Sequence, residues 1–591
     1  MPYIDKLTFE QLSKRIKVAC KESKPDLVLK NAKYINVFTE KIEIADIAIA
    51  DGHFVGIGNY DGENVIDCSN KIICPTLIDG HVHLESSMVS PRSFRDLVVP
   101  HGTCAVIADP HEITNVAGID GINYIKEMTE DLDLKVCIMI PSCVPATELD
   151  ESGAVLTAKD IKPLYDDDRV FGLAEMMNAY GITHDNKDCI EKCVDCNNCG
   201  KEIDGHAPSL SGDLLNGYLT ANISTDHECA DFDEAIEKLK RGQWIEIREG
   251  TVCKNLEALI GLFEAPYYQR CILVTDDNHA DTLKNLGHID KIIRMAINLG
   301  ADPIKAIKMA SLNPAIHYNL HNYGAIANGY FANFIVLNDL NKFEIDSVYL
   351  NGNIVSNGNK TLVDSDAKFN SLDKNKYKRV YDSFNMSDVT VSDLDFKKKG
   401  KKIRALELVP NGVLTKEVIL DIAEPIGNVT YGVDLKNDVA KIIVVERHKN
   451  TNHIGLGFIK GYGLKSGAVA SSIGHDSHNI IAVGTNDEDL VLAVNALKDN
   501  KGGIVVVNNG EILGGLVLEV AGLMSEKDEY YVSENLEKLK KICYDDLGVK
   551  NSIDPFMTLA FMQLSVIPEL KIIPKGLIRV MDQTIVEPIF D

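Results

Sequence analysis

Short apolar runs that end in polar residues recur through the first half of the chain. Eight of them lie between residues 72 and 277: Ile72–His83, Cys104–Glu112, Lys135–Val144, Val170–Met176, Glu202–His206, Ile223–His227, Trp244–Arg248 and Cys271–Asp277. Helical spacing of apolar residues appears between some of them, as in Asp231–Leu239 and Ile289–Asn298. Eight strand and helix alternations over about 240 residues are typical of a closed parallel barrel. The sequence therefore predicts an α/β fold with a (β/α)8, TIM-like barrel.

Strand patterns also flank this region on both sides. Before it, Ile42–Ala50 alternates apolar and polar residues and is followed by Asp51-Gly52, which is a hairpin signal. After it, Phe331–Leu337 and Val348–Val355 repeat the β pattern. We expect the two flanks to join in one small β domain.

A further block follows the second flank. Charge is dense around Asp373–Lys378 and Lys397–Lys402, which is typical of a linker. Beyond it the chain has three strand patterns and a helical one, at Val418–Ile422, Ile442–Val445, Gly503–Val507 and Asp487–Leu497. These predict an additional C-terminal α+β domain.

Composition and charge narrow the function. The chain has 591 residues and a formal net charge of −26, which argues against binding nucleic acid or an anionic membrane surface. Small molecules and copies of the chain itself are the expected partners. The first residues, Met1–Leu7, lack an apolar signal core, and no later run approaches the length of a membrane span. We therefore expect a cytoplasmic location.

Four of the 14 cysteines lie close together in a C-x3-C-x2-C-x2-C spacing: Cys189, Cys193, Cys196 and Cys199. Thiolates at such spacings can hold a structural zinc ion or an iron–sulfur cluster. The spacing is loose against known metal-binding patterns, and free thiols in a surface insertion are the alternative, so both interpretations stay open.

Metal-type side chains gather at the ends of the predicted strands. They comprise five histidines, a glutamate and an aspartate spread over six strand ends: His81, His83, His111, Glu175, His206, His227 and Asp276. The carboxyl ends of barrel strands form one mouth, and residues i and i+2 of a strand face the same side, as in His81-Val82-His83. Imidazole and carboxylate ligands suit manganese, iron or zinc. The sequence predicts a metal centre at this mouth.

Sequence motifs around these positions resemble the amidohydrolase superfamily and, within it, the adenine deaminase family. The motifs are Asp79–Met88, Asp109–Ile113, Pro141–Ala146, Gly172–Met177, Asp204–His206, Ile247–Gly250, Thr275–Asp277, Ser472–Asn479 and Ala521–Ser525. The resemblance covers nearly the whole chain. It implies a β-sandwich built from residues 1–74 and 319–365, a catalytic barrel over 75–318, a linker over 366–402 and a family-specific C-terminal domain over 403–591.

The resemblance also implies a ligand set for two metal ions. Many amidohydrolases bridge their metals with a carboxylated lysine on the fourth strand, where this chain has Glu175, whose carboxylate can bridge directly. His81 and His83 would bind one ion, and His206 and His227 the other. Asp276 would ligate the first ion and accept a proton from the attacking water. Manganese is the expected metal, with iron next and zinc third.

The activity implied by the resemblance is hydrolytic deamination of adenine to hypoxanthine and ammonia, a purine salvage reaction. Two divalent ions would activate the attacking hydroxide. His111 is expected to carry protons to the leaving ammonia, although a hydrogen bond from His111 to a metal ligand is an alternative. The family also suggests a homo-oligomer, and a homodimer in particular.

Five residues are candidates for contact with the purine: Glu85, Ser86, Arg248, His475 and His478. If the first strand continued past His83, Glu85 would point to the same face as the histidines and could protonate a ring nitrogen. A salt bridge or a helix cap is the alternative for Glu85, and an ion pair with Glu249 is the alternative for Arg248. His475 and His478 could instead bind another metal ion or make buried polar contacts at a turn. Asn278 stands where the family more often has arginine.

Two other functions remain open at this point. One is hydrolysis of a cyclic amide, as in dihydroorotase-like or hydantoinase-like relatives, against which the absent bridging lysine counts. The other is a non-catalytic scaffold, which we would expect to have lost ligand positions. The H-x-E pattern of His83–Glu85 matches half of the zinc nucleobase deaminase motif, but the second half, P-C-x-x-C, is absent from the chain.

Overall fold

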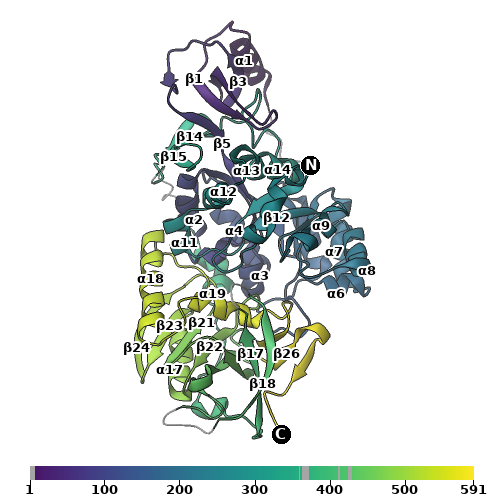
Figure 1. Ribbon diagram of the computed structural model, residues 1–591, viewed down its shortest axis with the longest axis vertical. Coiled ribbons are helices and arrows are strands. Elements are labelled where there is room, and N and C mark those ends of the chain that lie inside the picture. Colours follow the sequence, from purple (N-terminus) through teal and green to yellow (C-terminus); the bar gives the residue numbers. More distant parts are fainter. Residues whose placement is uncertain (1–6, 359, 363–371, 410–412, 424–428) are drawn as a thin grey trace.

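The computed structural model describes residues 7–358, 360–362, 372–409, 413–423 and 429–591. Three parts follow one another along the long axis (Figure 1): a sheet formed by the two flanks, a region of parallel strands, and a C-terminal region. Within the described residues, no helix is both long and apolar enough to cross a membrane.

The central part contains eight parallel strands in two sheets. Five form one sheet in the order β10-β9-β8-β7-β6: β6 (Leu77–Val82), β7 (Thr103–Ala108), β8 (Lys135–Ile140), β9 (Val170–Met176) and β10 (Glu202–Gly205). Three form the other: β11 (Thr225–Asp226), β12 (Trp244–Arg248) and β13 (Cys271–Val274). We call β6 to β13 with their connections the parallel-strand region. The α/β prediction is confirmed.

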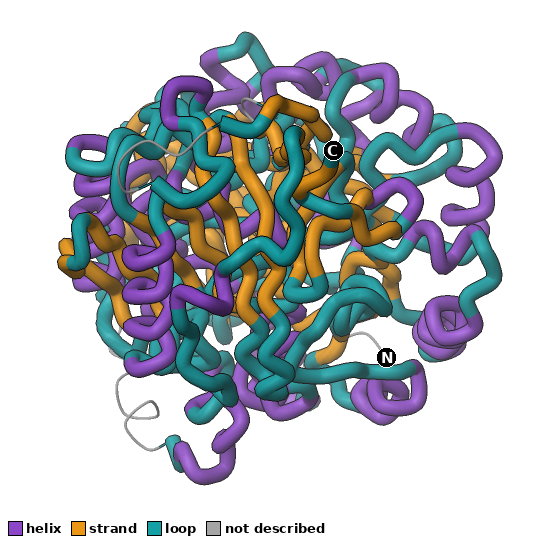
Figure 2. The backbone as a smooth tube through the Cα atoms, turned by 90° about the horizontal axis from the view of Figure 1, so that it is seen from below, coloured by secondary structure: helices purple, strands orange, loops and turns teal. Residues whose placement is uncertain are grey.

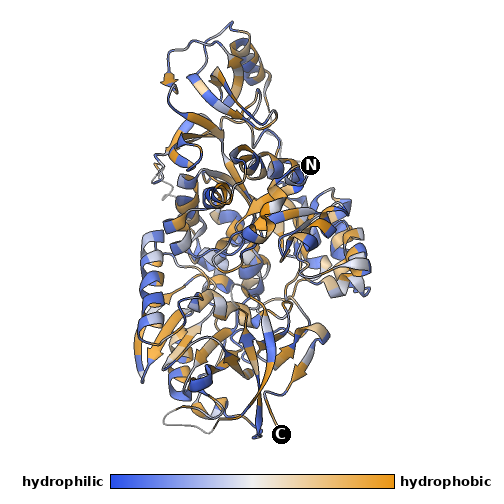
Figure 3. Ribbon diagram, viewed as in Figure 1, coloured by the Kyte–Doolittle hydropathy of each residue, from blue (hydrophilic) through white to orange (hydrophobic). Residues whose placement is uncertain are grey.

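Helices connect these strands, as parallel pairing requires, and further helices follow β13. The main ones are α2 (Pro91–Val98), α3 (His111–Ala117), α4 (Ile119–Met128), α7 (Lys187–Asn198), α8 (Gly212–Thr220), α9 (Phe232–Leu239), α11 (Ala280–Leu286) and α12 (Ile289–Asn298). The two predicted helical segments correspond to α9 and α12. Apolar strands lie inside and more polar helices outside, which Figure 3 shows as orange strands beside bluer helices.

Hydrogen bonds link the two parallel sheets on both sides. Ser224 N donates to Ile203 O at 2.8 Å between β11 and β10. On the other side, Asp276 N donates to His81 O at 3.0 Å, and Val82 forms a parallel bridge with Asp276. The residues that follow β13 therefore lie against the end of β6, which brings Asp276 next to the His81–His83 segment.

The first predicted apolar run is not one strand. Ile72–Pro75 forms β5, which pairs antiparallel with β14 (Phe334–Asp339) in the flanking sheet, and β6 begins only at Leu77. Pro75 ends β5 because it offers no backbone N–H for a further pairing bond. The single strand expected over Ile72–His83 is wrong, but the break connects the flanking sheet directly to the parallel-strand region.

The flanking sheet joins residues from both ends of the parallel-strand region, in the order β16-β15-β14-β5-β1-β2-β3 with β4 on β1. Its other strands are β1 (Leu27–Asn36), β2 (Lys41–Ala50), β3 (His53–Gly58), β4 (Val65–Asp67), β15 (Glu344–Leu350) and β16 (Asn353–Ser356), and α1 (Phe9–Ala19) lies beside it. Asp51 and Gly52 both have positive φ, 48° and 71°, so the predicted hairpin turn between β2 and β3 is confirmed.

The C-terminal region contains one large mixed sheet, whose strands cross the middle of Figure 2. Its strands are β17 (Lys402–Leu408), β18 (Thr415–Asp421), β19 (Val439–Val445), β20 (Ile454–Lys460), β21 (Ala468–Ser471), β22 (Ile480–Gly484), β23 (Gly503–Asn508), β24 (Glu511–Val517) and β28 (Ile589–Phe590). Helices α17 (Asp487–Asp499), α18 (Glu529–Asp545) and α19 (Pro555–Ala560) pack with it. A short sheet follows, made of β25 (Leu570–Ile573), β26 (Gly576–Arg579) and β27 (Thr584–Val586).

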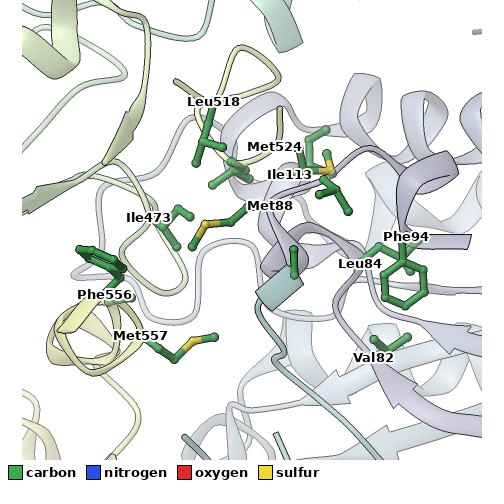
Figure 4. Packing of buried hydrophobic residues seen from close by; sticks show 14 of the residues in the cluster. Val82, Leu84, Met88, Phe94, Ile113, Ile473, Leu518, Met524, Phe556 and Met557 are labelled. Carbon is green, nitrogen blue, oxygen red and sulfur yellow. The ribbon is translucent and has the colours of Figure 1, made fainter. Parts of the chain in front are cut away.

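The parallel-strand and C-terminal regions share one hydrophobic core. In Figure 4, Met88 of the first region lies beside Ile473 of the second, with Phe556 and Met557 of α19 nearby. All four side chains are buried and belong to one cluster. The C-terminal region is thus packed against the end of the parallel strands where β6 finishes.

Helix α8 offers a matched test of packing. Leu215 is fully buried and its neighbour Leu214 is 50% exposed. We expect Leu215→Ala to lower the free energy of unfolding by about 2 to 5 kcal/mol, because the change removes buried methyl groups and leaves a cavity. Leu214→Ala is expected to change it by less than about 0.5 kcal/mol. Urea unfolding followed by circular dichroism measures both, and equal effects of the two variants would contradict the packing described here.

Lys571 on β25 provides a pH-dependent test. Its side chain is fully buried and donates to Val413 O at 2.7 Å and Phe561 O at 2.9 Å. Burial lowers the pKa of its ammonium group to about 7, below the ordinary 10.5. Between these values the unfolded chain holds a proton that the folded chain lacks, so stability rises with pH.

Relative to Lys571→Met, the free energy of unfolding of the unmodified protein should rise by up to about 1.4 kcal/mol per pH unit above pH 7. Below pH 7 the difference between the two proteins should be constant. Urea unfolding of both proteins from pH 6 to 9 measures this difference in the free energy of unfolding. Parallel pH profiles of the two proteins would show that the pKa of Lys571 is not lowered in the folded state.

Candidate metal centre and active site

The predicted ligands come together at the carboxyl ends of the parallel strands. His81 lies within β6 and Glu175 within β9, while the others stand one or two residues after the end of a strand. All are at most 4% exposed: His81, His83, Glu175, His206, His227 and Asp276. Such a concentration of buried ionisable groups is costly unless they are paired or bind an ion.

Glu175 lies between two pairs of histidines. Its Oε1 is 3.5 Å from His83 Nε2 and 4.0 Å from His81 Nε2. Its Oε2 is 2.8 Å from His206 Nδ1 and 3.2 Å from His227 Nε2. One carboxylate thus presents a different oxygen to each pair, as a bridging ligand does.

These side chains fit divalent metal ions. His81 Nε2 and His83 Nε2 lie 3.2 Å apart, and Asp276 Oδ1 lies 3.2 Å from His83 Nε2 and 3.9 Å from His81 Nε2. Atoms that share one ion at about 2.1 Å are separated by roughly 3 to 4 Å. Burial and the neighbouring His227 and His83 lower the pKa of His81 far below its ordinary value, whereas nearby carboxylates raise the pKa of His83, His206 and His227. An ion bound here would therefore displace protons from these imidazoles.

Arg248 holds Asp276. Its Nη1 lies 2.5 Å from Asp276 Oδ2 and 2.5 Å from Glu228 Oε1. These two carboxylates, and not the Glu249 of the alternative ion pair, are the partners of this nitrogen. Burial alone would raise the pKa of Asp276, but Arg248 and the nearby histidines lower it well below its ordinary value. Asp276 is therefore an ionised carboxylate. Glu228 lies 3.6 Å from both His206 Nδ1 and His227 Nε2, and sequence reasoning missed it.

His111 begins α3 next to the six predicted ligands, which we call the metal-type cluster: His81, His83, Glu175, His206, His227 and Asp276. Its Nδ1 lies 2.8 Å from Asp109 Oδ2 and 3.5 Å from Glu175 Oε1. Its Nε2 faces the other way, 3.5 Å from Glu112 Oε1 and 3.7 Å from Asp476 Oδ1 of the C-terminal region. His111 therefore lies between the metal-type cluster and the C-terminal region.

Glu85 is buried near the same site, but not for the predicted reason. The strand ends at Val82, and Leu84–Ser87 forms a short 3-10 helix, because the chain turns into α2 after it. Glu85 Oε1 accepts a hydrogen bond from Ile113 N at 3.1 Å, and Oε2 has no hydrogen-bond partner in the described structure. Burial raises the pKa of Glu85 to about 7.

His475 and His478 reach the site from the loop between β21 and β22. Their partner is Glu112 at the start of α3: His475 Nδ1 lies 2.7 Å from its Oε1, and His478 Nε2 hydrogen-bonds to its Oε2. Ser86, the remaining candidate, donates to Asp277 Oδ1 at 2.5 Å. Glu112, Asp277 and Asp476 were not predicted, although each stands beside a predicted residue in the sequence.

The cysteine cluster lies away from this site, on α7. Cys189, Cys193 and Cys196 are buried in an apolar cluster, and Cys196 Sγ donates to Glu202 O at 3.2 Å. Cys199 is exposed at the end of the helix. The three inward thiols therefore pack as small apolar side chains.

Comparison with known proteins places the chain in a family. The amidohydrolase family model matches residues 72–355, and the adenine deaminase C-terminal domain model matches residues 412–584. The adenine deaminase of Geobacillus kaustophilus is 42% identical over 96% of this chain and 97% of its own length. The chain belongs to the adenine deaminase family. The predicted family is thus confirmed.

Two further adenine deaminases agree with this assignment. The protein of Clostridium acetobutylicum is 42% identical over 97% of this chain and 99% of its own length. The protein of Dehalococcoides mccartyi is 43% identical over 96% of this chain and 98% of its own length. The amidohydrolase family is metal-dependent, and the buried His, Asp and Glu cluster of this adenine deaminase family member can bind a metal.

Proposed function

We propose that this chain hydrolyses adenine to hypoxanthine and ammonia. The observation that carries the proposal is the buried Glu175 carboxylate between two histidine pairs, in a chain that belongs to the adenine deaminase family. We further propose that the two parallel sheets close into a (β/α)8 barrel over residues 75–318. Residues 1–74 and 319–365 would form the flanking β-sandwich, 366–402 the linker and 403–591 the C-terminal domain, and the chain would assemble as a homodimer.

Two Mn²⁺ ions are the proposed cofactors. His81, His83 and Asp276 would hold one, His206 and His227 the other, and Glu175 both. Divalent ions in such a site supply a nucleophilic hydroxide at neutral pH. The protein's part is to keep the ligands deprotonated and in place, and Arg248 does this for Asp276 through its 2.5 Å contact.

Three side chains would move protons while C6 of adenine changes from amine to carbonyl. The Asp276 carboxylate accepts the proton of the attacking water. Glu85, with its pKa near 7, holds a proton that it can give to ring nitrogen N1. His111 delivers a proton to the amino group, so that the C6–N bond breaks with neutral ammonia as the leaving group.

Product analysis tests this function. Manganese-loaded protein should release one ammonia and one hypoxanthine for each adenine consumed, without turnover of dihydropyrimidines or hydantoins. Ring opening of a dihydropyrimidine in the absence of adenine turnover would instead favour the cyclic amide hydrolase.

A further inference from the structure

Asp476 brings a carboxyl group of the C-terminal region to the side of His111. It lies in the loop between β21 and β22 and is 4% exposed. Its Oδ1 lies 3.7 Å from His111 Nε2 and 3.9 Å from His475 Nδ1, and both distances are too long for a hydrogen bond. Its Oδ2 has no hydrogen-bond partner in the described structure. Because buried polar atoms are nearly always paired, this carboxyl is placed for a partner that the described residues do not supply.

The loop that carries Asp476 is held at both of its sides. The backbone N–H of His475 donates to Ala560 O of the C-terminal region at 3.1 Å. Asn479 Nδ2 donates to Glu151 O of the parallel-strand region at 2.7 Å. The backbone of Asp476 is thus fixed between the two regions, while its side chain keeps an oxygen without a partner.

His111 turns its Nε2 toward Asp476. Its Nδ1 lies 2.8 Å from Asp109 Oδ2, and its backbone N–H donates to Asp109 Oδ1 at 3.0 Å. Since carboxylate oxygens accept, the hydrogen on Nδ1 is used in the bond to Asp109. Nε2 is then the nitrogen from which the proposed proton passes to the amino group of adenine. That amino group must come close to Nε2, on the side where Asp476 lies.

We propose that Asp476 accepts a hydrogen bond from the amino group of adenine and so holds this group for the proton from His111. The inference rests on the proposed function. Attack of hydroxide on one face of C6 makes this carbon tetrahedral, and the amino group bends toward the opposite face. An acceptor that takes one of its N–H groups leaves the nitrogen lone pair free for the proton of His111.

The C6–N bond then breaks, and its electron pair leaves with ammonia. The hydroxyl on C6 loses its proton and becomes the carbonyl of hypoxanthine. This proton and the one that Asp276 takes from water restore the protons given by Glu85 and His111. Asp476 itself neither gains nor loses a proton in the reaction.

The surroundings of Asp476 suit an acceptor near the reacting carbon. Burial, Glu112 and Glu175 raise the pKa of its carboxyl to about 7, while His111 and His475 act to lower it. In either protonation state the carboxyl has an oxygen that can accept a hydrogen bond. The influence of Glu175 places Asp476 within electrostatic reach of the carboxylate that lies between the histidine pairs.

The test compares two leaving groups in manganese-loaded protein. In 6-chloropurine the amino group is replaced by chlorine, which has no N–H and departs as chloride without a proton. Asp476→Ala should lower kcat/KM for adenine by about 10- to 100-fold, the effect of losing a hydrogen bond to a charged group. It should change kcat/KM for 6-chloropurine, and its inhibition constant against adenine, by less than about twofold. Hypoxanthine formation measures both reactions.

Asp476→Asn separates an acceptor from a proton carrier. Asparagine keeps a carbonyl oxygen at nearly the same place but has no acidic proton to pass on. It should recover part of the adenine turnover that Asp476→Ala loses. If Asp476→Ala fails to fold, Asp476→Leu fills the same space without a polar atom and takes its place.

Asp487→Ala is the matched control. Asp487 is also buried and pairs with Lys441 Nζ at 2.7 Å. It begins α17, whose Leu490 lies in one apolar cluster with Ile443, whereas Ile442 belongs to the core shared with the parallel-strand region. Neighbouring residues of a strand point to opposite faces, so Asp487 lies on the far face of the large sheet. Its replacement should leave the preference for adenine over 6-chloropurine unchanged.

Three results would overturn the role of Asp476. They are an equal loss of adenine and 6-chloropurine turnover in Asp476→Ala, full adenine turnover by that variant, and activity of Asp476→Asn as low as that of Asp476→Ala. Absence of ammonia release from adenine by the unmodified protein would instead overturn the proposed function itself.

Discussion

Glu175→Ala is expected to lower kcat/KM for adenine by at least about 10³-fold, since metal ions contribute several kcal/mol to the stabilisation of such transition states. Glu175 offers one oxygen to His81 and His83 and the other to His206 and His227. Its removal takes a ligand from both proposed ions at once. Bound manganese, measured by mass spectrometry after gel filtration, should fall together with activity.

Glu202→Ala is the control for this variant. Glu202 begins β10, at the opposite end of the strands from His206, and it contacts Ser224 rather than the metal-type cluster. Its replacement should leave manganese content and kcat/KM within about twofold of the unmodified protein, as for a substitution distant from the site. Full activity of Glu175→Ala would refute the bridging role.

His111→Ala is expected to lower kcat by about 10² to 10⁴-fold, the usual contribution of a general acid or base. The variant should keep its manganese, and KM for adenine should change little, because His111 is proposed to carry protons and not to bind metal. Steady-state kinetics with metal analysis measures all three quantities.

His101→Ala tests whether the effect is specific to the site. His101 precedes β7 and pairs with Asp290 at 3.0 Å, whereas His111 follows the same strand. The two histidines thus stand at opposite ends of one strand, and His101→Ala should retain normal kcat. If His111→Ala instead loses manganese, the 3.5 Å approach of His111 to Glu175 marks a metal ligand and the proton-transfer role fails.

The sequence predicted the positions that follow directly from strand geometry. Side chains after successive parallel strands meet at one edge, so His206, His227 and Asp276 could be placed together without coordinates. The prediction failed where the backbone changes direction. Pro75 separates β5 from β6, and a 3-10 helix at Leu84–Ser87 replaces the strand expected to carry Glu85.

Contacts between the regions could not be predicted. Glu112 and His478 hydrogen-bond although they are 366 residues apart in the chain. Their pairing depends on how the C-terminal region packs over the parallel strands, and this is set by apolar contacts spread over many residues. Glu228 was missed for a related reason, because its distance from His206 and His227 depends on the loop that follows β11.

Metal titration of the apoprotein tests the central claim most directly. After the protein is stripped with a chelator, Mn²⁺ is added stepwise and ammonia release from adenine is measured at each addition. The account predicts that activity rises until two equivalents are bound per chain and then stays constant. Full activity at one equivalent, or without any metal, would contradict a centre in which Glu175 serves two ions.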